Sequence, residues 1–256
     1  MIEPRIRAIS FDLWDTLFVD DSDEPKRRAQ GLPDKYTARR ALVHEALERH
    51  EGIERIKVDA AYDAVDAAFR KVWDQQHVTW TVRDRLTVLL SGLQRELPEP
   101  ELAELVRAHE EMELEVRPEL IPGAKKALDD LRVAGFHLAV ISDTVFSPGR
   151  SLRKLLDGEG LLGLFAALVF SDEVLRSKPD PAVFLRACEA LVVAPQELVH
   201  VGDRAEKDVV GPHAVGARAV LCTAARDRHA GQPTGAEAAF DDYARLPGLI
   251  HELNPR

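Results

Sequence analysis

The sequence predicts an α/β fold in which a doubly wound, parallel sheet carries an inserted block of helices. An apolar segment near the N-terminus, residues 5–13, is typical of a buried strand. Apolar residues then recur at helical spacing from Tyr36 to Leu114. After Pro118 strands and helices alternate, which favours right-handed crossovers and a parallel sheet.

The inserted block begins with residues 19–34, which are polar and predict an exposed loop. Four apolar stripes with spacings of three and four residues follow, and each predicts an amphipathic helix. Their members are Ala41, Leu42, Ala46 and Leu47; Ala60, Ala64, Ala67, Ala68 and Val72; Leu86, Leu89, Leu90 and Leu93; and Leu102, Leu105, Val106 and Met112. We therefore expect a helical domain at 19–118, inserted into an α/β domain made of 1–18 and 119–256.

The second half of the chain continues the α/β pattern. Pro122 and Gly123 open a helix that ends at Ala134, before Gly135. Apolar segments then predict buried strands, and the segments between them have helical spacing. The expected strands are 136–141, 167–170, 198–201 and 218–222, and the expected helices are 148–157, 181–191 and 206–214.

Polar side chains stand at the carboxyl ends of three predicted strands, namely Asp12, Ser142 and Asp203. Open parallel sheets bind their ligands at this edge. Buried carboxylates are unfavourable unless they are paired or bind a cation. Asp12, Asp203 and the nearby Asp208 therefore predict an acidic metal pocket at one edge of the sheet.

Four short motifs follow one another along the chain. They are Asp12-Leu13-Trp14-Asp15-Thr16; Ser142 after Leu138-Ala139-Val140-Ile141; Lys178 in Ser177-Lys178-Pro179-Asp180-Pro181; and Gly202-Asp203 with Asp208. Together they resemble the motifs of the haloacid dehalogenase (HAD) superfamily of hydrolases, and the resemblance spans residues 6–222. It implies a Rossmann-like core with a helical cap of the C1 type inserted after the first motif.

The resemblance implies a nucleophile and a metal site. Asp12 would attack phosphorus and form an aspartyl-phosphate, which water then hydrolyses. Asp12, the backbone carbonyl of Trp14 and Asp203 would bind Mg²⁺. Asp208 would bind the metal directly, bind it through water, or orient Lys178.

The resemblance also implies how the substrate is held. Ser142 would hydrogen-bond a phosphoryl oxygen of the substrate, and Asp143 would lie in the same substrate-binding region. Lys178 would pair with Asp12 and with the transferring group, and would stabilise the transition state by its charge. The expected ligand is a small phosphorylated molecule.

The first motif departs from the family pattern at Trp14. Phosphatases of the superfamily usually have an aspartate there, which protonates the leaving group and later activates water. An indole cannot transfer a proton at neutral pH, and losing such a group typically costs about 10²–10⁴ in rate. Asp15, a cap residue or a substrate with a good leaving group could compensate.

This departure leaves several functions open beside a Mg²⁺-dependent phosphatase. Family dehalogenases have an aromatic residue at position 14 but need no metal, whereas this chain keeps Asp203 and Asp208. Phosphonate hydrolases add a cap lysine that forms a Schiff base, and Lys35, Lys57 and Lys71 are available. A binding module that keeps the fold with little turnover is the non-enzymatic alternative.

Composition and charge restrict the binding partners and the cellular location that we expect for the chain. A net charge of −10 over 256 residues argues against nucleic-acid or anionic-membrane binding, and no apolar run is long enough to span a membrane. Cys188 and Cys222 form no close pair, and residues 1–7 lack the apolar core of a secretion signal. We therefore expect a cytoplasmic protein, and the sequence specifies no oligomeric state.

Overall fold

The computed structural model describes residues 5–254 and confirms the predicted α/β fold, with a six-stranded sheet in the order β5-β4-β1-β6-β7-β8. Every neighbouring pair in this sheet is parallel. The strands are β1 (Ala8–Phe11), β4 (His137–Ser142), β5 (Ala167–Phe170), β6 (Leu198–Gly202), β7 (Arg218–Cys222) and β8 (Ala238–Phe240). Residues 1–4 and 255–256, which we expected to belong to the α/β domain, lie outside the described range.

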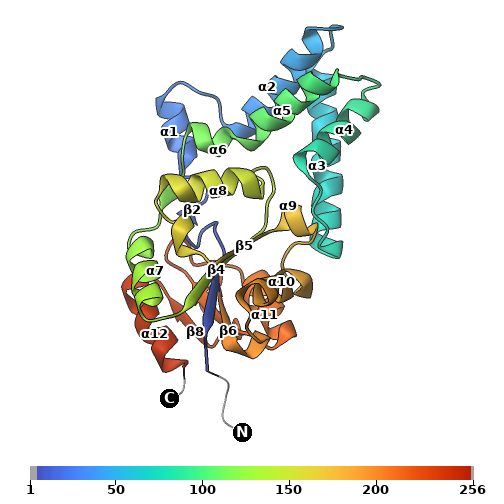
Figure 1. The fold of residues 1–256 in the computed structure, drawn as a ribbon. Helices are drawn as coiled ribbons and strands as arrows, with labels where there is room; N and C mark the ends of the chain where they lie inside the picture. Colours follow the sequence, from blue (N-terminus) through green and yellow to red (C-terminus); the bar gives the residue numbers. More distant parts are fainter. Residues whose placement is uncertain (1–4, 255–256) are drawn as a thin grey trace.

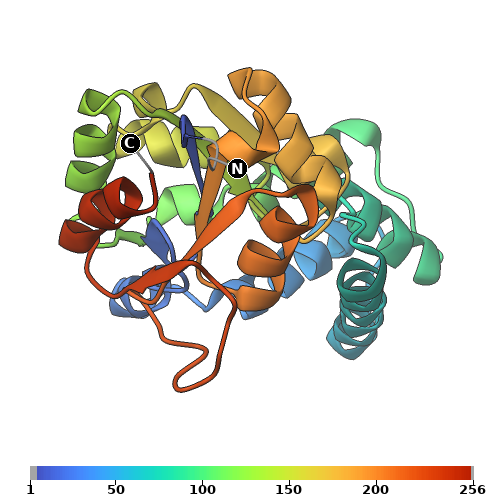
Figure 2. The same cartoon turned by 90° about the horizontal axis from the view of Figure 1, so that it is seen from below.

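Helices cover both faces of this sheet, as the alternation of strands and helices predicts (Figures 1 and 2). Ile9 and Phe11 of β1 pack into one apolar cluster with residues of helices on the first face, and Ala8 packs into another cluster on the opposite face. The first face is covered by α7 (Ala124–Val133), α8 (Gly149–Gly158) and α12 (Leu246–Glu252), and the second by α10 (Pro181–Leu191) and α11 (Val210–Val215).

A block of helices lies beyond the carboxyl ends of the strands (Figure 1). Its members are α1 (Asp23–Ala29), α2 (Lys35–Glu48), α3 (Arg55–Gln76), α4 (Val82–Gly92), α5 (Glu99–Glu110) and α6 (Met112–Glu115). Helices α2 to α5 share an apolar cluster of their own, which includes Val43, Val58, Leu86 and Leu105. None of the helices within residues 5–254 has the length and apolar character needed to cross a membrane.

The prediction of an exposed loop at residues 19–34 is wrong. The segment Phe18–Val19 (β2) pairs antiparallel with Glu119–Leu120 (β3), and helix α1 follows. Within α1 the side chain of Asp23 is fully buried, and its carboxylate accepts a hydrogen bond from Lys35 Nζ at 2.8 Å. Since this buried ion pair joins residues twelve positions apart, local polarity gives no sign of it.

Several short elements also differ from the sequence pattern. The helix expected at 206–214 begins as a π-helix, Ala205–Val209, before α11. Strand β8 was not predicted, and neither were α9 (Ser171–Val174) and the 3₁₀-helices Leu162–Leu164, Pro195–Glu197 and Tyr243–Arg245. The π-helix matters most for the site, because such turns often occur at functional positions and this one contains Asp208.

Candidate active site

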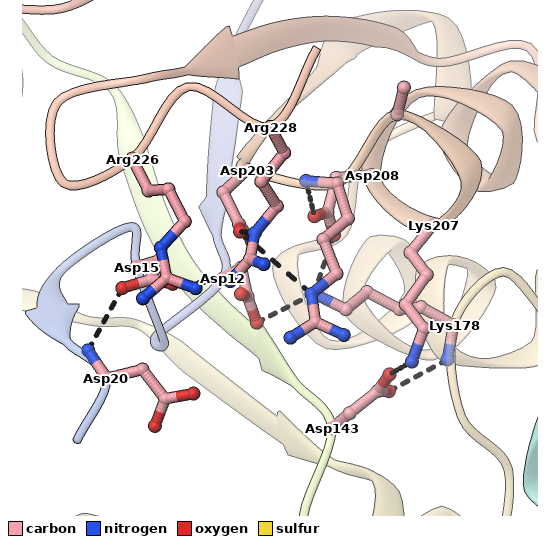
Figure 3. A network of polar contacts seen from close by, with 12 residues as sticks. Asp12, Asp15, Asp20, Asp143, Lys178, Asp203, Lys207, Asp208, Arg226 and Arg228 are labelled. Atoms are coloured by element: carbon pink, nitrogen blue, oxygen red, sulfur yellow. Dashed lines mark hydrogen bonds and ion pairs between the residues drawn. The ribbon is translucent and has the colours of Figure 1, made fainter.

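Asp12 is the first residue after the central strand β1. Its backbone N–H donates to the carbonyl of Val201 in β6 at 2.9 Å, which fixes Asp12 at the carboxyl edge of the sheet (Figure 3). Burial raises the pKa of its carboxyl to about 7, and Lys178 opposes this rise. A cation bound beside Asp12 would favour the ionised form that a nucleophile requires.

Lys178 lies between two carboxylates. Its Nζ is 2.7 Å from Asp12 Oδ1 and 2.7 Å from Asp208 Oδ1, and its side chain is only 2% exposed. Burial alone would lower the pKa of this ammonium, but Asp12 and Asp208 hold the pKa of Lys178 above its ordinary value. The site therefore contains a fixed positive charge in contact with Asp12.

Asp12, Asp203 and Asp208 form the acidic cluster that the sequence predicts. One oxygen from each carboxylate lies within 4.8 Å of the other two. Asp203 Oδ1 is buried and has no hydrogen-bond partner within the described part of the chain. Because Mg²⁺ prefers carboxylate oxygens, these residues fit such an ion. The contribution of the Trp14 carbonyl stays a prediction.

The position of Asp208 depends on a close approach to Gly202 at the end of β6. A Cβ atom on residue 202 would lie 2.3 Å from Asp208 Cγ, which is too close for any real contact. Gly202→Ala should therefore displace Asp208 and weaken Mg²⁺ binding by about 10–100-fold, the usual effect of disturbing a metal site's support. Calorimetric titration with Mg²⁺ checks this expectation.

The matched control is Gly163→Ala, since nothing lies within 4 Å of a Cβ placed there. We expect Gly163→Ala to bind Mg²⁺ as the unmodified protein does. Equal Mg²⁺ affinities for the two variants would show that the close approach of Asp208 to Gly202 does not support the metal site.

Asp208 is also held by a chain of buried polar groups that the sequence analysis did not identify. His200 Nε2 lies 3.1 Å from Asp208 Oδ1, and His200 Nδ1 lies 2.8 Å from Ser10 Oγ. Burial lowers the pKa of His200, which favours a neutral ring. A neutral ring that donates to Asp208 through Nε2–H must accept from the Ser10 hydroxyl at Nδ1. Despite its burial, Lys178 and His200 hold the pKa of Asp208 well below its usual value.

Asp15 belongs to a second buried contact that joins distant parts of the chain. Its Oδ2 atom is 2.5 Å from Arg228 Nη2, and Arg228 Nε is 2.6 Å from Asp203 Oδ2 (Figure 3). The Asp15 backbone has a φ of 51°, which turns the chain after Trp14. Arg228 thus fixes Asp203 through Oδ2 and leaves Oδ1 for a cation. The predicted role of Asp15 in proton transfer stays a prediction.

Ser142 and Asp143 follow one another at the end of β4. The Ser142 side chain is buried, and its Oγ lies 3.4 Å from the Asp143 carbonyl. Asp143 accepts hydrogen bonds from the Lys178 backbone N–H and from Lys207 Nζ, each at 2.8 Å. Asp143 therefore holds the segment that carries Lys178, while its predicted contact with substrate, and that of Ser142, stay predictions.

A cavity of about 480 Å³ lies between this edge of the sheet and the helical block. Asp12, Trp14 and Lys178 line it on the side of the sheet. The side of the cavity formed by the helical block includes Lys35, Tyr36, Arg39, Arg40, Tyr62, Arg70, Trp73 and Glu113. Lys207 Nζ lies 3.4 Å from the centre of the Trp73 ring, so a cation–π contact joins the helical block to the sheet.

Known proteins with similar sequences include named phosphatases. The chain is 29% identical over 214 residues to a glyceraldehyde 3-phosphate phosphatase from Methanopyrus kandleri, a match that covers 82% of this chain and 81% of the relative. It is 41% identical over 101 residues to a phosphoserine phosphatase from Thermus thermophilus, which covers 40% of this chain and only 39% of that relative.

A solved structure and a family model agree with these sequence matches. A crystal structure of a HAD phosphatase from Thermococcus onnurineus superposes with a TM-score of 0.61 at 24% identity, over 96% of this chain and 98% of that one. The family model of haloacid dehalogenase-like hydrolases matches residues 6–216, which include all four motifs. The chain therefore belongs to the haloacid dehalogenase-like hydrolases.

Proposed function

We propose that this hydrolase is a Mg²⁺-dependent phosphatase that acts on a small organophosphate through an aspartyl-phosphate at Asp12. One observation carries the proposal: Asp12 shares an acidic cluster with Asp203 and Asp208, and Lys178 contacts Asp12 at 2.7 Å. This arrangement supplies a nucleophile, a cation site and a fixed positive charge at one edge of the sheet. The relatives named for phosphatases support the same chemistry.

The proposed reaction has two displacements at phosphorus. A carboxylate oxygen of Asp12 forms a bond to phosphorus while the ester P–O bond breaks and the alcohol leaves. Water then attacks the same phosphorus, the bond to Asp12 breaks, and phosphate is released. Lys178 stabilises negative charge on the phosphoryl oxygens during both displacements. Mg²⁺ held by Asp12, Asp203 and Asp208 would neutralise further charge on those oxygens.

We further propose that residues 19–118 form a cap that excludes water from the reaction and selects the substrate. The cavity of about 480 Å³ between this block and the sheet fits a small molecule. The aromatic residues Tyr36, Tyr62 and Trp73 and the arginines Arg39 and Arg40 line the side formed by this block. The cavity therefore offers both apolar and cationic contacts to the part of the substrate that does not react.

Removal of divalent cations tests the proposal. The protein should release phosphate from p-nitrophenyl phosphate with Mg²⁺, lose this activity in EDTA and regain it when Mg²⁺ is added back. Mg²⁺ should also raise the melting temperature, because a ligand that binds only the folded state stabilises it. Asp203→Asn should lose most of this thermal shift. Equal rates with Mg²⁺ and with EDTA would contradict the proposal.

Trp14 favours one second candidate, a hydrolase of 2-haloacids. Trp14 lines the cavity together with Asp12 and stands where the family's dehalogenases have an aromatic residue. The substrate test should therefore include 2-haloacids with and without Mg²⁺. Release of halide in EDTA would favour this second function over the phosphatase.

The structure gives no support to a Schiff base at two of the available lysines. Glu113, Asp23 and Asp21 hold the pKa of Lys35 above its ordinary value despite burial, which opposes the neutral amine that a Schiff base requires. Lys57 Nζ pairs with Glu54 at 2.6 Å. Phosphonoacetaldehyde belongs in the same substrate test, and we expect no turnover of it.

A further inference from the structure

The proposed phosphatase lacks a proton donor at the usual place, because Trp14 cannot exchange protons. Another carboxyl group in the cavity would have to protonate the leaving alcohol. Such a group must line the cavity with Asp12 and must not be held by a cation or by a structural hydrogen bond. The need for such a group rests on the proposed phosphatase function.

Most carboxylates of the cavity are already engaged. Asp12 and Asp208 belong to the metal cluster. The remaining bound carboxylates and their partners are Asp21 with Lys35 Nζ (3.2 Å), Glu24 with the Lys35 N–H (3.1 Å), Asp34 with the Thr37 N–H (2.7 Å), Glu113 with Lys35, Arg39 and Ser147, and Asp143 with Lys178 and Lys207. Asp66 faces Arg40 and Arg85 at 3.9 and 3.8 Å.

Asp20 is different from all of these. It lines the cavity, yet no residue within the described range 5–254 forms a hydrogen bond or an ion pair with its carboxylate. Figure 3 shows this carboxylate directed away from Asp15, without a partner among the residues drawn. Asp20 is therefore the cavity carboxyl that is available to a substrate.

The backbone of Asp20 is nevertheless fixed relative to the nucleophile. Asp20 follows β2 directly, and its N–H donates to Asp15 Oδ1 at 3.0 Å. Asp15 is held through Arg228 to Asp203, so one series of contacts joins Asp20 to the metal cluster. A free carboxylate on a fixed backbone can be held within hydrogen-bond reach of a substrate in the cavity, and a general acid–base group requires such reach.

We propose that Asp20 is the catalytic acid–base of this enzyme, in place of the aspartate that Trp14 replaces. In the first displacement the Asp20 carboxylic acid gives its proton to the departing alkoxide as the ester P–O bond breaks. In the second displacement the resulting carboxylate takes a proton from the water that attacks phosphorus. Asp20 then returns to its protonated form, and the cycle yields one alcohol and one phosphate.

The surroundings of Asp20 suit both steps. Burial, with Asp21 and Asp15, raises the pKa of Asp20 to about 6 against the opposing charges of Lys35 and Arg204. An acid with a pKa near the working pH is present in both forms, which allows it to give and to take a proton. Asp15 cannot serve in the same way while Arg228 and the Asp20 N–H hold its two oxygens.

The test compares Asp20→Asn with Asp129→Asn, which removes the same charge from a position on α7, outside the cavity, where the side chain is 48% exposed. Each variant is assayed with an alkyl phosphate, whose leaving group needs a proton, and with 2,4-dinitrophenyl phosphate, whose leaving group does not. Asp20→Asn should turn over the alkyl phosphate about 10²-fold or more slowly than the wild type. Asp129→Asn should stay within about threefold of the wild type, a change too small for the loss of an acid–base group.

The dinitrophenyl substrate separates the two displacements. Asp20→Asn should release one dinitrophenolate per enzyme in a rapid burst, because phosphorylation of Asp12 needs no acid with this leaving group. Steady turnover should then be slow, because no base activates water, and phosphorylated Asp12 should accumulate. Asp20→Glu should restore part of the steady rate.

The pH dependence of kcat/KM gives a further test of the role of Asp20. In the wild type, kcat/KM for the alkyl phosphate should fall as pH rises above about 6, since the proton donor is then lost. Ionisation of a phosphate substrate occurs near the same pH, with a pKa of about 6. The decrease in kcat/KM that ionisation of Asp20 causes should disappear in Asp20→Asn, whereas a decrease caused by ionisation of the substrate would persist.

Two results would overturn the role of Asp20. One is an Asp20→Asn variant that matches Asp129→Asn with both substrates. The other is an equal loss with both substrates and no burst, which would mean that Asp20 only shapes the cavity. A wild-type enzyme that releases no phosphate from either substrate would instead overturn the phosphatase itself, and the role of Asp20 with it.

Discussion

Replacing Asp12 by asparagine should lower phosphatase turnover by about 10⁴-fold or more, because loss of the nucleophile in other hydrolases costs up to about 10⁶. Asparagine has the shape of aspartate but cannot form an aspartyl-phosphate. Phosphate release from p-nitrophenyl phosphate measures the loss. In the same samples, trapping of phosphorylated protein by acid quench should succeed for the wild type and fail for Asp12→Asn.

This variant should keep its fold. Burial raises the pKa of Asp12, which means that the ionised carboxylate is unfavourable in the folded protein, and asparagine removes that charge. Lys178 keeps its contact with Asp208 at 2.7 Å. We therefore expect a melting temperature at neutral pH, without Mg²⁺, that is equal to or above that of the wild type. Phosphorylated protein trapped from Asp12→Asn would show that another residue is the nucleophile.

Replacing Lys178 by methionine should damage both activity and stability. Loss of a preorganised charge at the reacting group typically costs about 10²–10³ in kcat. Removing one partner of a buried ion pair typically costs about 3–5 kcal/mol, and here Asp12 and Asp208 both lose their partner. Urea unfolding without Mg²⁺ measures the stability, and kcat with saturating Mg²⁺ measures the activity.

The stability loss in Lys178→Met should depend on pH. Without the ammonium, burial raises the pKa of Asp12 further and lifts that of Asp208 above the value of the unfolded chain. A carboxyl with a raised pKa destabilises the fold at pH values above its unfolded pKa, and protonation relieves this penalty. The difference from the wild type should therefore be smaller at pH 5 than at pH 8. An equal difference at both pH values would show that these carboxylates do not cause it.

The matched control for Lys178→Met is Lys154→Met. Lys154 carries the same charge and pairs with Glu111 at 2.9 Å, but its side chain is 59% exposed and lies outside the cavity. Exposed pairs contribute little, typically below about 1 kcal/mol. We expect this variant to differ little from the wild type in kcat and in urea unfolding.

Much of the α/β fold could be predicted because the buried strands are mostly apolar. Strands β1, β4, β5, β6 and β7 all overlap the predicted segments. The β2–β3 pair and α1 could not be predicted in this way. β2 has two residues, and Asp23 and Lys35 stabilise α1 through a buried contact that only the folded chain creates. Three-residue β8 is also too short to show a period.

The site could be predicted only in part, for a similar reason. Asp12 and Asp203 follow neighbouring parallel strands, and the rule that such ends meet brings them together without any coordinates. Arg228 is 213 residues from Asp15, and no local pattern relates the two. Asp20 lies in the segment that the sequence predicts as a polar loop. Its position on the cavity wall therefore could not be predicted without the fold.

The short β2–β3 ladder has a consequence for how such enzymes diversify. Val19 lies opposite Glu119, so the chain leaves the core and returns to it at adjacent points. Paired strands lie about 5 Å apart, and an insertion whose ends are this close does not distort the α/β domain that carries it. A different domain could therefore be inserted between Val19 and Glu119 without any change in the order of the parallel strands. Evolution can thus exchange the part proposed to select the substrate, Asp20 included, while Asp12, Lys178, Asp203 and Asp208 are inherited unchanged.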